Sequence, residues 1–312
     1  MHIATSFPAF FRTLLAVAGT LVAALPVSSA HAQNTDEKIV VSGASGNLGG
    51  RTVEELLARG VSASRLILVS RTPEELKQYA DRGASVRFGD FTKPESLPAA
   101  YAGGTRMLLI SVGGNGEVTA TALLKRAIDA AKAAGVRHIA YTSYVGITRG
   151  DTAGRAADHQ ATEEALRASG VAWTMLRNSI YMHGQIGQAA RWVADGRAVI
   201  PPNESPIGYV TREDCARAAA AVLSTPGHEG KAYDITGPEL IGVREAAAIA
   251  SAVTGKPIEV VQGGADVRPG FGRPAMAFTT THFEELTGRK PTSLRELFEA
   301  NKAALLAPPA AR

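Results

Sequence analysis

The chain has 312 residues, of which 45% are hydrophobic and 20% are charged, a composition typical of a globular protein with a sizeable core. The net charge of +4 is modest and the basic residues are scattered, which argues against a nucleic-acid partner bound through a basic patch. The single cysteine, Cys215, excludes an internal disulfide framework.

Residues 1–32 have the layout of a secretory signal. One cation, Arg12, precedes an apolar run over residues 14–27, and small residues follow up to an Ala-His-Ala sequence that ends at residue 32. The apolar run is shorter than the roughly 20 residues that a membrane span requires. We therefore expect cleavage, export to the periplasm and no stable membrane span afterwards. An uncleaved anchor stays open, and so does a start codon set too far upstream, which would leave the protein cytoplasmic.

The strongest motif lies at residues 38–50, with the sequence KIVVSGASGNLGG. An apolar, β-branched run ends at Gly43, and Gly46 and Gly49 follow at three-residue intervals before a helix-compatible stretch. Strand, glycine-rich turn and helix in this order are typical of the first half of a dinucleotide-binding βαβ unit. Gly43 permits the tight turn, Gly46 lets backbone amides approach a pyrophosphate, and Gly49 lets the helix pack against the strand. The positive end of the helix dipole favours the same phosphates.

Strands and helices then alternate along the chain, which predicts a doubly wound parallel sheet. The alternation loosens after residue 177, where residues 207–211 look extended and a Gly/Pro-rich loop covers residues 263–274. The expected strands are 65–70, 85–88, 107–111, 137–143, 171–176 and 232–236. The expected helices are 51–59, 74–81, 94–102, 119–134, 158–169, 185–194, 212–223 and 243–253, with two more near His282 and Leu294.

The end of the second expected strand indicates which dinucleotide is bound. A site for NAD presents an acid to the ribose 2′-hydroxyl about 20 residues after the last glycine. This sequence offers Ser70 and Arg71 instead. A guanidinium pairs well with a 2′-phosphate through charge-assisted bonds, so the sequence favours NADP(H) over NAD(H). The alternative is that Arg71 is a solvated turn residue.

Several motifs together carry a resemblance to a known family. They are GASGNLG from Gly43, VSRTP from Val69, AYTS from Ala140, Asp158-His159 with Glu163, LRN from Leu176, TRED from Thr211, and GHEGK from Gly227 with Tyr233. In these motifs the chain resembles the atypical short-chain dehydrogenase/reductases. Within that group it is most similar to the NmrA-like branch, and particularly to the type 2 NAD(P)H:quinone oxidoreductases. The resemblance runs from about residue 38 to 261. It implies a Rossmann-type NAD(P)-binding domain at residues 36–200 and a smaller C-terminal substrate-covering region at 201–312, with strand 232–236 free to return to the main sheet.

The resemblance also implies roles for individual positions. The glycine loop would hold the pyrophosphate, Arg71 the 2′-phosphate, and the nicotinamide end would lie beyond the fourth and fifth strands. The implied cofactor-binding residues are Gly43, Ser45, Gly46, Asn47, Leu48, Gly49, Arg71, Asp90 (beside the adenine), Ser111, Val112, Gly113, Thr142 and Ser143. The candidate catalytic residues are His159, Tyr144, Asn178 and Tyr181, of which Tyr144 borders the nicotinamide and Asn178 and Tyr181 face the substrate.

One departure from the family pattern concerns the usual Tyr-x-x-x-Lys pair, whose matching positions here are Arg155 and His159. His159 is either a ribose contact or acid–base group, or a structural residue paired with Glu163 one turn later. Quinone reduction needs little from the protein beyond binding and orientation, because the cofactor supplies the hydride. The missing pair is therefore compatible with a quinone reductase.

The resemblance thus implies an NAD(P)H-dependent oxidoreductase that passes a hydride from NADPH to a quinone-like small molecule or a similar electron-poor carbonyl acceptor. The alternative is a non-catalytic, NADP(H)-binding redox sensor or regulator. The seven histidines show no metal-ligand spacing, so we expect no metal site. The sequence does not fix the oligomeric state, and a homodimer is left open.

Overall fold

The fold is built on a central sheet of seven parallel strands in the order β3-β2-β1-β4-β5-β6-β8. The computed structural model describes residues 1–2, 37–114, 116–152, 154–264 and 272–307. The strands are β1 (Ile39–Ser42), β2 (Leu66–Ser70), β3 (Ser85–Phe88), β4 (Arg106–Leu109), β5 (His138–Tyr144), β6 (Ala172–Asn178) and β8 (Lys231–Ile235). The predicted doubly wound parallel sheet is confirmed.

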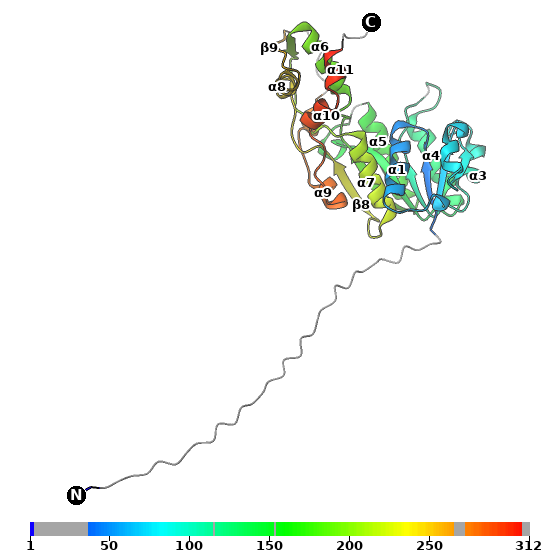
Figure 1. The fold of residues 1–312 in the computed structure, drawn as a ribbon. Coiled ribbons are helices and arrows are strands. Elements are labelled where there is room, and N and C mark those ends of the chain that lie inside the picture. Colours follow the sequence, from blue (N-terminus) through cyan, green and yellow to red (C-terminus); the bar gives the residue numbers. More distant parts are fainter. Residues whose placement is uncertain (3–36, 115, 153, 265–271, 308–312) are drawn as a thin grey trace. The chain divides into compact units, whose positions relative to one another are not determined.

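Helices cover both faces of the sheet (Figure 1). One face packs against α1 (Asn47–Ala58), α2 (Lys77–Ala80), α7 (Arg212–Ser224) and α9 (His282–Thr287). The other packs against α3 (Leu97–Tyr101), α4 (Ala120–Ala133) and α5 (Arg155–Ala168). Successive residues of β1 alternate between these cores, since Ile39 and Val41 join the first and Val40 the second. Burial on both faces explains why the strands read as continuous apolar runs.

A further core lies in the C-terminal half of the chain. Figure 1 shows its helices gathered at one end of the folded unit. The elements are α6 (Gly184–Asp195), α8 (Val243–Thr254), α10 (Leu294–Ala300), α11 (Lys302–Leu306) and a two-stranded parallel sheet of β7 (Arg197–Ile200) and β9 (Glu259–Gln262). This core begins before residue 200, because Trp192 of α6 belongs to it, whereas β8 returns to the main sheet beside β6.

Short 3₁₀ turns join several of these elements. They are η1 (Ala63–Arg65), η2 (Pro73–Leu76), η3 (Pro94–Ser96), η4 (Ile147–Arg149) and η5 (Pro274–Met276). The sequence did not predict β7 or α11. The extended stretch expected at 207–211 forms only isolated bridges, Ile207 to Ile241 and Tyr181 to Val210. Both differences lie in the C-terminal half, where pairing is made over long sequence separations.

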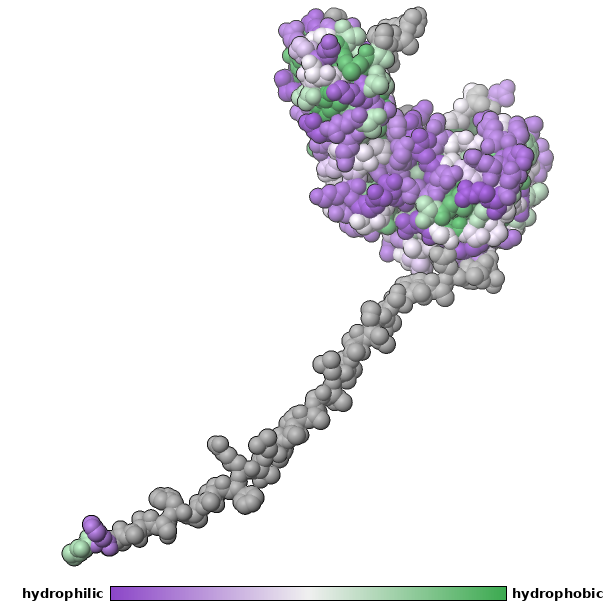
Figure 2. Space-filling view, in the orientation of Figure 1, coloured by the Kyte–Doolittle hydropathy of each residue, from purple (hydrophilic) through white to green (hydrophobic). Residues whose placement is uncertain are grey.

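The surface of the folded unit is mostly hydrophilic on the face in view, with scattered apolar patches (Figure 2). Within the described ranges, no helix has the length and apolar character needed to cross a membrane. The expected signal at residues 1–32 lies outside the described residues apart from Met1 and His2, so export remains an expectation.

Candidate active site at the carboxyl ends of the strands

The turn between β1 and α1 has the geometry that a dinucleotide phosphate requires. Gly43 has a φ of +82°, and Gly46 N donates to Gly43 O at 3.0 Å. A Cβ on Gly49 would lie 2.1 Å from Gly43 O, so only glycine lets the helix approach the strand this closely. The helix begins without a side-chain cap, which leaves its first-turn amides available to an anion. A hollow of about 650 Å³ lies beside the turn, lined in part by Ser45, Gly46 and Asn47.

A cluster of hydroxyl groups joins this turn to the end of β2. The Oγ atoms of Ser45 and Ser70 are 2.7 Å apart, and Thr72 N donates to Ser70 Oγ at 2.9 Å. Arg71 lies exposed within the cluster. Burial raises the pKa of Asp90, but hydrogen bonds from Thr92 and the charges of Arg71 and Lys93 outweigh it and hold that pKa below its usual value. Arg71, expected at the 2′-phosphate, and Asp90, expected beside the adenine, therefore lie near each other.

A hollow of about 910 Å³ opens at the carboxyl ends of β5 and β6. It brings together seven of the residues that the sequence selected: Ser111, Thr142, Ser143, Tyr144, His159, Asn178 and Tyr181. Val112 and Gly113 do not line it and are exposed in the loop after β4. The carboxyl end of a parallel sheet is where doubly wound proteins bind their ligands. The roles assigned to these residues stay predictions.

His159 is held by two tyrosines. Its Nδ1 lies 2.8 Å from Tyr141 Oη, and its ring stacks on that of Tyr144 at 5.7 Å between centroids and 12° between planes. Burial lowers the pKa of His159 to about 4, against the opposing charges of Asp158 and Glu163. The imidazole is therefore neutral at neutral pH, where it is a hydrogen-bonding group and not a charged acid.

Of the two alternatives for His159, the pairing with Glu163 is not the one that the structure forms. Glu163 is buried and is bound instead by Arg177 through two hydrogen bonds of 2.8 Å, by Arg167 at 2.7 Å and by Ser143 Oγ at 2.7 Å. Burial raises the pKa of Glu163, but these bonds and the charge of Arg177 outweigh it and lower that pKa. The ionised carboxylate thus fixes Ser143, which lines the cavity.

The phenols of the cavity keep their protons. Burial raises the pKa of Tyr144 and also that of Tyr181, where a hydrogen bond with Asn178 acts in the opposite direction. Tyr144 Oη donates to Met276 Sδ at 3.4 Å. Asn178 Oδ1 and Ser179 Oγ are buried without a hydrogen-bond partner in the described part of the chain, although both residues line the cavity. Buried polar atoms of this kind are normally paired, which fits a site that a ligand completes.

Sequence reasoning missed the wall that the C-terminal half contributes. Gln185, Gln188 and Trp192 of α6 line the cavity, together with Tyr209 and Arg273. The first three have the spacing of one helix face, which is a signal available from the sequence. Arg273 follows a Gly/Pro-rich stretch of sequence, and no local pattern indicates its position. Among the described residues, no group of three or more metal-ligating side chains occurs.

A glycine turn with free helix amides and an aromatic cavity at the strand ends define an α/β protein that binds a dinucleotide beside a small molecule. Residues 43–226 match the model of a family described as NAD(P)H-binding. The chain is 36% identical to quinone oxidoreductase 2 of Escherichia coli (strain K12) over 223 residues, which are 70% of this chain and 76% of that protein. The chain therefore belongs to the NAD(P)H-binding family, and it is an NAD(P)H-dependent oxidoreductase.

Two solved structures are similar over most of the chain. The Citrobacter sp. triphenylmethane reductase complexed with NADP(H) is 31% identical, with a TM-score of 0.76, and covers 84% of this chain and 99% of its own. The E. coli NADPH-dependent quinone oxidoreductase complexed with NADPH is 29% identical, with a TM-score of 0.74, and covers 85% and 99%. The family and fold implied by the sequence motifs are thus confirmed.

Proposed function

We propose that the protein reduces quinones, or similar electron-poor carbonyl acceptors, with a hydride from NADPH. The observation that carries the proposal is the cavity of about 910 Å³ that joins the predicted nicotinamide side, at Ser111 and Thr142, to the predicted substrate side, at Asn178 and Tyr181. Aromatic rings line much of it, which suits a planar acceptor. The similarity to a quinone oxidoreductase supports the same acceptor class.

The choice of NADPH over NADH rests on the surroundings of Arg71. An exposed guanidinium at the end of β2, next to the hydroxyl cluster of Ser45, Ser70 and Thr72, offers several donors to a 2′-phosphate. An acid that would bind a free 2′-hydroxyl does not take its place. Two similar structures hold NADP(H) or NADPH, in line with this assignment.

The residues of the cavity bind the acceptor and orient it against the cofactor, and NADPH, when bound, supplies the hydride. Ser111 N donates to Thr142 Oγ1 at 2.9 Å, and this bond ties the ends of β4 and β5 together beneath the site. The Tyr144 and Tyr181 phenols have raised pKa values, so they keep their protons and can donate hydrogen bonds to an acceptor oxygen. Tyr144 does so when its O–H turns away from Met276 Sδ, a weak acceptor. The proton that completes the hydroquinone then comes from water.

The test is turnover by the purified chain. We expect NADPH oxidation, followed by the loss of its absorbance, with a panel of benzoquinones and naphthoquinones, and formation of one hydroquinone per NADPH. Tyr144→Phe keeps the ring that stacks on His159 and removes one donor, so we expect kcat to fall while NADPH affinity is unchanged. Tight NADPH binding without turnover of any acceptor would refute the proposal and favour the sensor alternative.

A further inference from the structure

The cationic side chains of the cavity outnumber its acids. Arg155, Arg191 and Arg273 line it, and among the described residues only one carboxylate, that of Glu204, does so. Glu204 is already engaged, because its Oε1 accepts a hydrogen bond from Val243 N at the start of α8. A cavity lined by one sign of charge concentrates ligands of the opposite sign.

The three arginines differ in how far the protein neutralises them. Arg273 Nη1 donates to Asp151 at 2.6 Å, and Arg191 Nη2 donates to the neutral Gln188 at 2.7 Å. Arg155 is the first residue of α5, and it has no hydrogen-bond or ion-pair partner in the part of the chain that is described. With Arg273 paired to Asp151, Arg155 and Arg191 remain as two cations that no described carboxylate neutralises, and they leave the cavity positive.

Two of these arginines, Arg155 and Arg273, lie close to the Tyr144 phenol. Burial raises the pKa of the Tyr144 phenol and Asp151 raises it further, whereas Arg273 and Arg155 lower it. The geometry agrees, because Arg155 lies one helical turn before His159, whose ring stacks on Tyr144, and Arg273 lies three residues before Met276, whose Sδ accepts a hydrogen bond from Tyr144 Oη. They come from separate elements, α5 and the segment that precedes η5, so the fold assembles the pair.

The same neighbourhood is aromatic. The rings of Tyr144, Tyr181, Trp192 and Tyr209 all line the cavity. A planar ring can stack between such walls, while a guanidinium fork binds two oxygens of one substituent at its edge. A carboxylate or a sulfonate presents those oxygens.

We propose that the site selects planar aromatic acceptors that carry an anionic substituent, a carboxylate or a sulfonate, bound by Arg155 and Arg273 beside Tyr144. The inference rests on the proposed function for the ring, and on the charges of the cavity for the substituent. Neutral quinones then bind through their rings alone, without a bond to Arg155 or Arg273.

The test compares two ligands of nearly equal size, 9,10-anthraquinone-2-sulfonate and its neutral 2-sulfonamide. The dissociation constants of the two compounds are measured on the NADP⁺-loaded full chain by quenching of tryptophan fluorescence. The KM of each anthraquinone, with NADPH as the reductant, is measured in parallel. We expect the sulfonate to bind about tenfold more tightly at low salt, the low end of what one charge-assisted hydrogen bond contributes. The advantage should vanish near 1 M salt, where the Debye length is about 3 Å.

The variants separate local from overall charge. Arg155→Gln, which breaks no pair in the described structure, should remove most of the sulfonate advantage, and Arg273→Gln should do the same. Arg295→Gln is the matched control, because this exposed residue of α10 lies 3.9 Å from Glu299 and does not line the cavity. It should leave the advantage intact.

Equal affinity for the two compounds, or an equal loss in Arg295→Gln, would overturn the inference. Binding is measured without turnover, so the two proposals fail separately. Tighter sulfonate binding without reduction of either anthraquinone or of any quinone in the panel would refute the proposed function and keep the charge selectivity. Reduction of both anthraquinones, bound with equal affinity, would support the proposed function and overturn the charge selectivity.

Discussion

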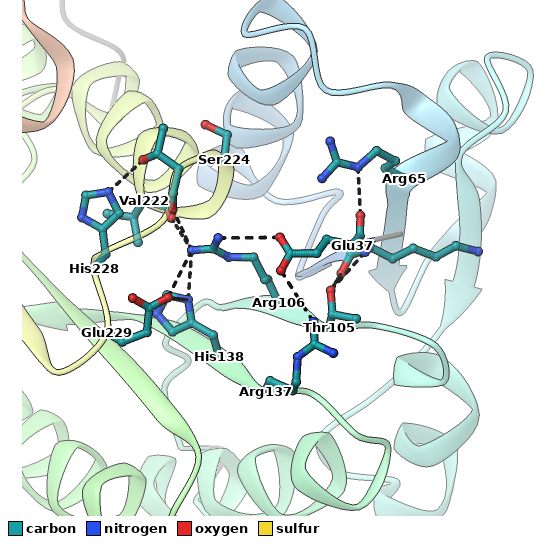
Figure 3. A network of polar contacts seen from close by, with 12 residues as sticks. Glu37, Arg65, Thr105, Arg106, Arg137, His138, Val222, Ser224, His228 and Glu229 are labelled. Carbon is teal, nitrogen blue, oxygen red and sulfur yellow. Dashed lines mark hydrogen bonds and ion pairs between the residues drawn. The ribbon is translucent and has the colours of Figure 1, made fainter. Parts of the chain in front are cut away.

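His138 makes the stability of the fold depend on pH, and its contacts fix the sign of that dependence. It is the first residue of β5, whose carboxyl end borders the cavity, and Figure 3 shows it between Arg106 and Glu229. Arg106 Nη2 lies 3.1 Å from His138 Nδ1, and a guanidinium can only donate, so Nδ1 accepts. His138 Nε2 lies 2.8 Å from Thr174 Oγ1, which itself donates to His228 O at 2.6 Å. The neutral imidazole with its proton on Nε2 satisfies every bond.

A second proton on His138 would point an N–H at the Arg106 guanidinium. Burial lowers the pKa of His138 to about 4 from the usual 6.5, the charge of Arg106 adds to this, and Glu229 opposes it. The unfolded chain therefore binds more protons than the folded chain between pH 6.5 and about 4. The contribution to stability is complete above pH 6.5 and is lost as the pH falls through this window. At about 1.4 kcal/mol per pH unit, the loss from this residue is about 2 kcal/mol by pH 5 and about 3 kcal/mol in full.

Urea unfolding followed by tryptophan fluorescence at pH 7.5 and pH 5.0 measures this loss. His138→Gln is the informative variant, because the amide oxygen of glutamine can still accept from Arg106 but cannot be protonated in this range. We expect the native chain to lose about 2 kcal/mol more than the variant between the two pH values. If both chains lose the same free energy of unfolding, His138 does not titrate as its contacts imply.

Three further predictions concern the cofactor site and the buried carboxylate behind the cavity. Arg71→Ala should weaken NADPH binding by about 1.5–3 kcal/mol, or roughly 10–150-fold in Kd, and leave NADH binding unchanged. Isothermal titration calorimetry measures both, with the exposed Arg82→Ala as the control. Equal weakening of the two cofactors would contradict the 2′-phosphate assignment. Gly46→Val should abolish NADPH binding with a folded chain by circular dichroism, whereas Gly49→Ala, whose Cβ would meet Gly43 O at 2.1 Å, should prevent folding. Glu163→Gln leaves Arg177 buried without its counter-charge and should cost about 3–5 kcal/mol in urea unfolding, while the exposed neighbour Glu164→Gln should cost almost nothing.

The features that the sequence predicted well are local ones. The turn at Gly43 and Gly49 follows from backbone sterics within a few residues, and β3 has the bounds that the sequence predicted, 85–88. By contrast, β7 is four residues long and pairs with β9, about sixty residues further along the chain. Neither strand has a periodicity long enough to separate it from a loop, so only the tertiary pairing defines them.

The contacts of Glu163 show why side-chain pairing is harder to predict than strands. The four-residue spacing to His159 is correct for a helix, so the sequence offers that pair as one of two alternatives for His159. The fold instead brings Arg177 of β6 against the same carboxylate, and a buried guanidinium with two bonds of 2.8 Å displaces a neutral imidazole. The same limit applies to the cavity, whose lining includes both Arg155 and Arg273 through packing that no local pattern encodes.

The direction of the chemistry follows from what stands in place of Tyr-x-x-x-Lys. Alcohol oxidation by that pair needs a phenolate at neutral pH, which a nearby lysine charge stabilises. Here His159 is neutral, and burial raises the pKa of both Tyr144 and Tyr181. The described phenols of the cavity therefore stay protonated, and they act as hydrogen-bond donors and not as the base of an alcohol oxidation. Such donors stabilise an oxygen that gains charge, which supports the proposed reduction of a quinone.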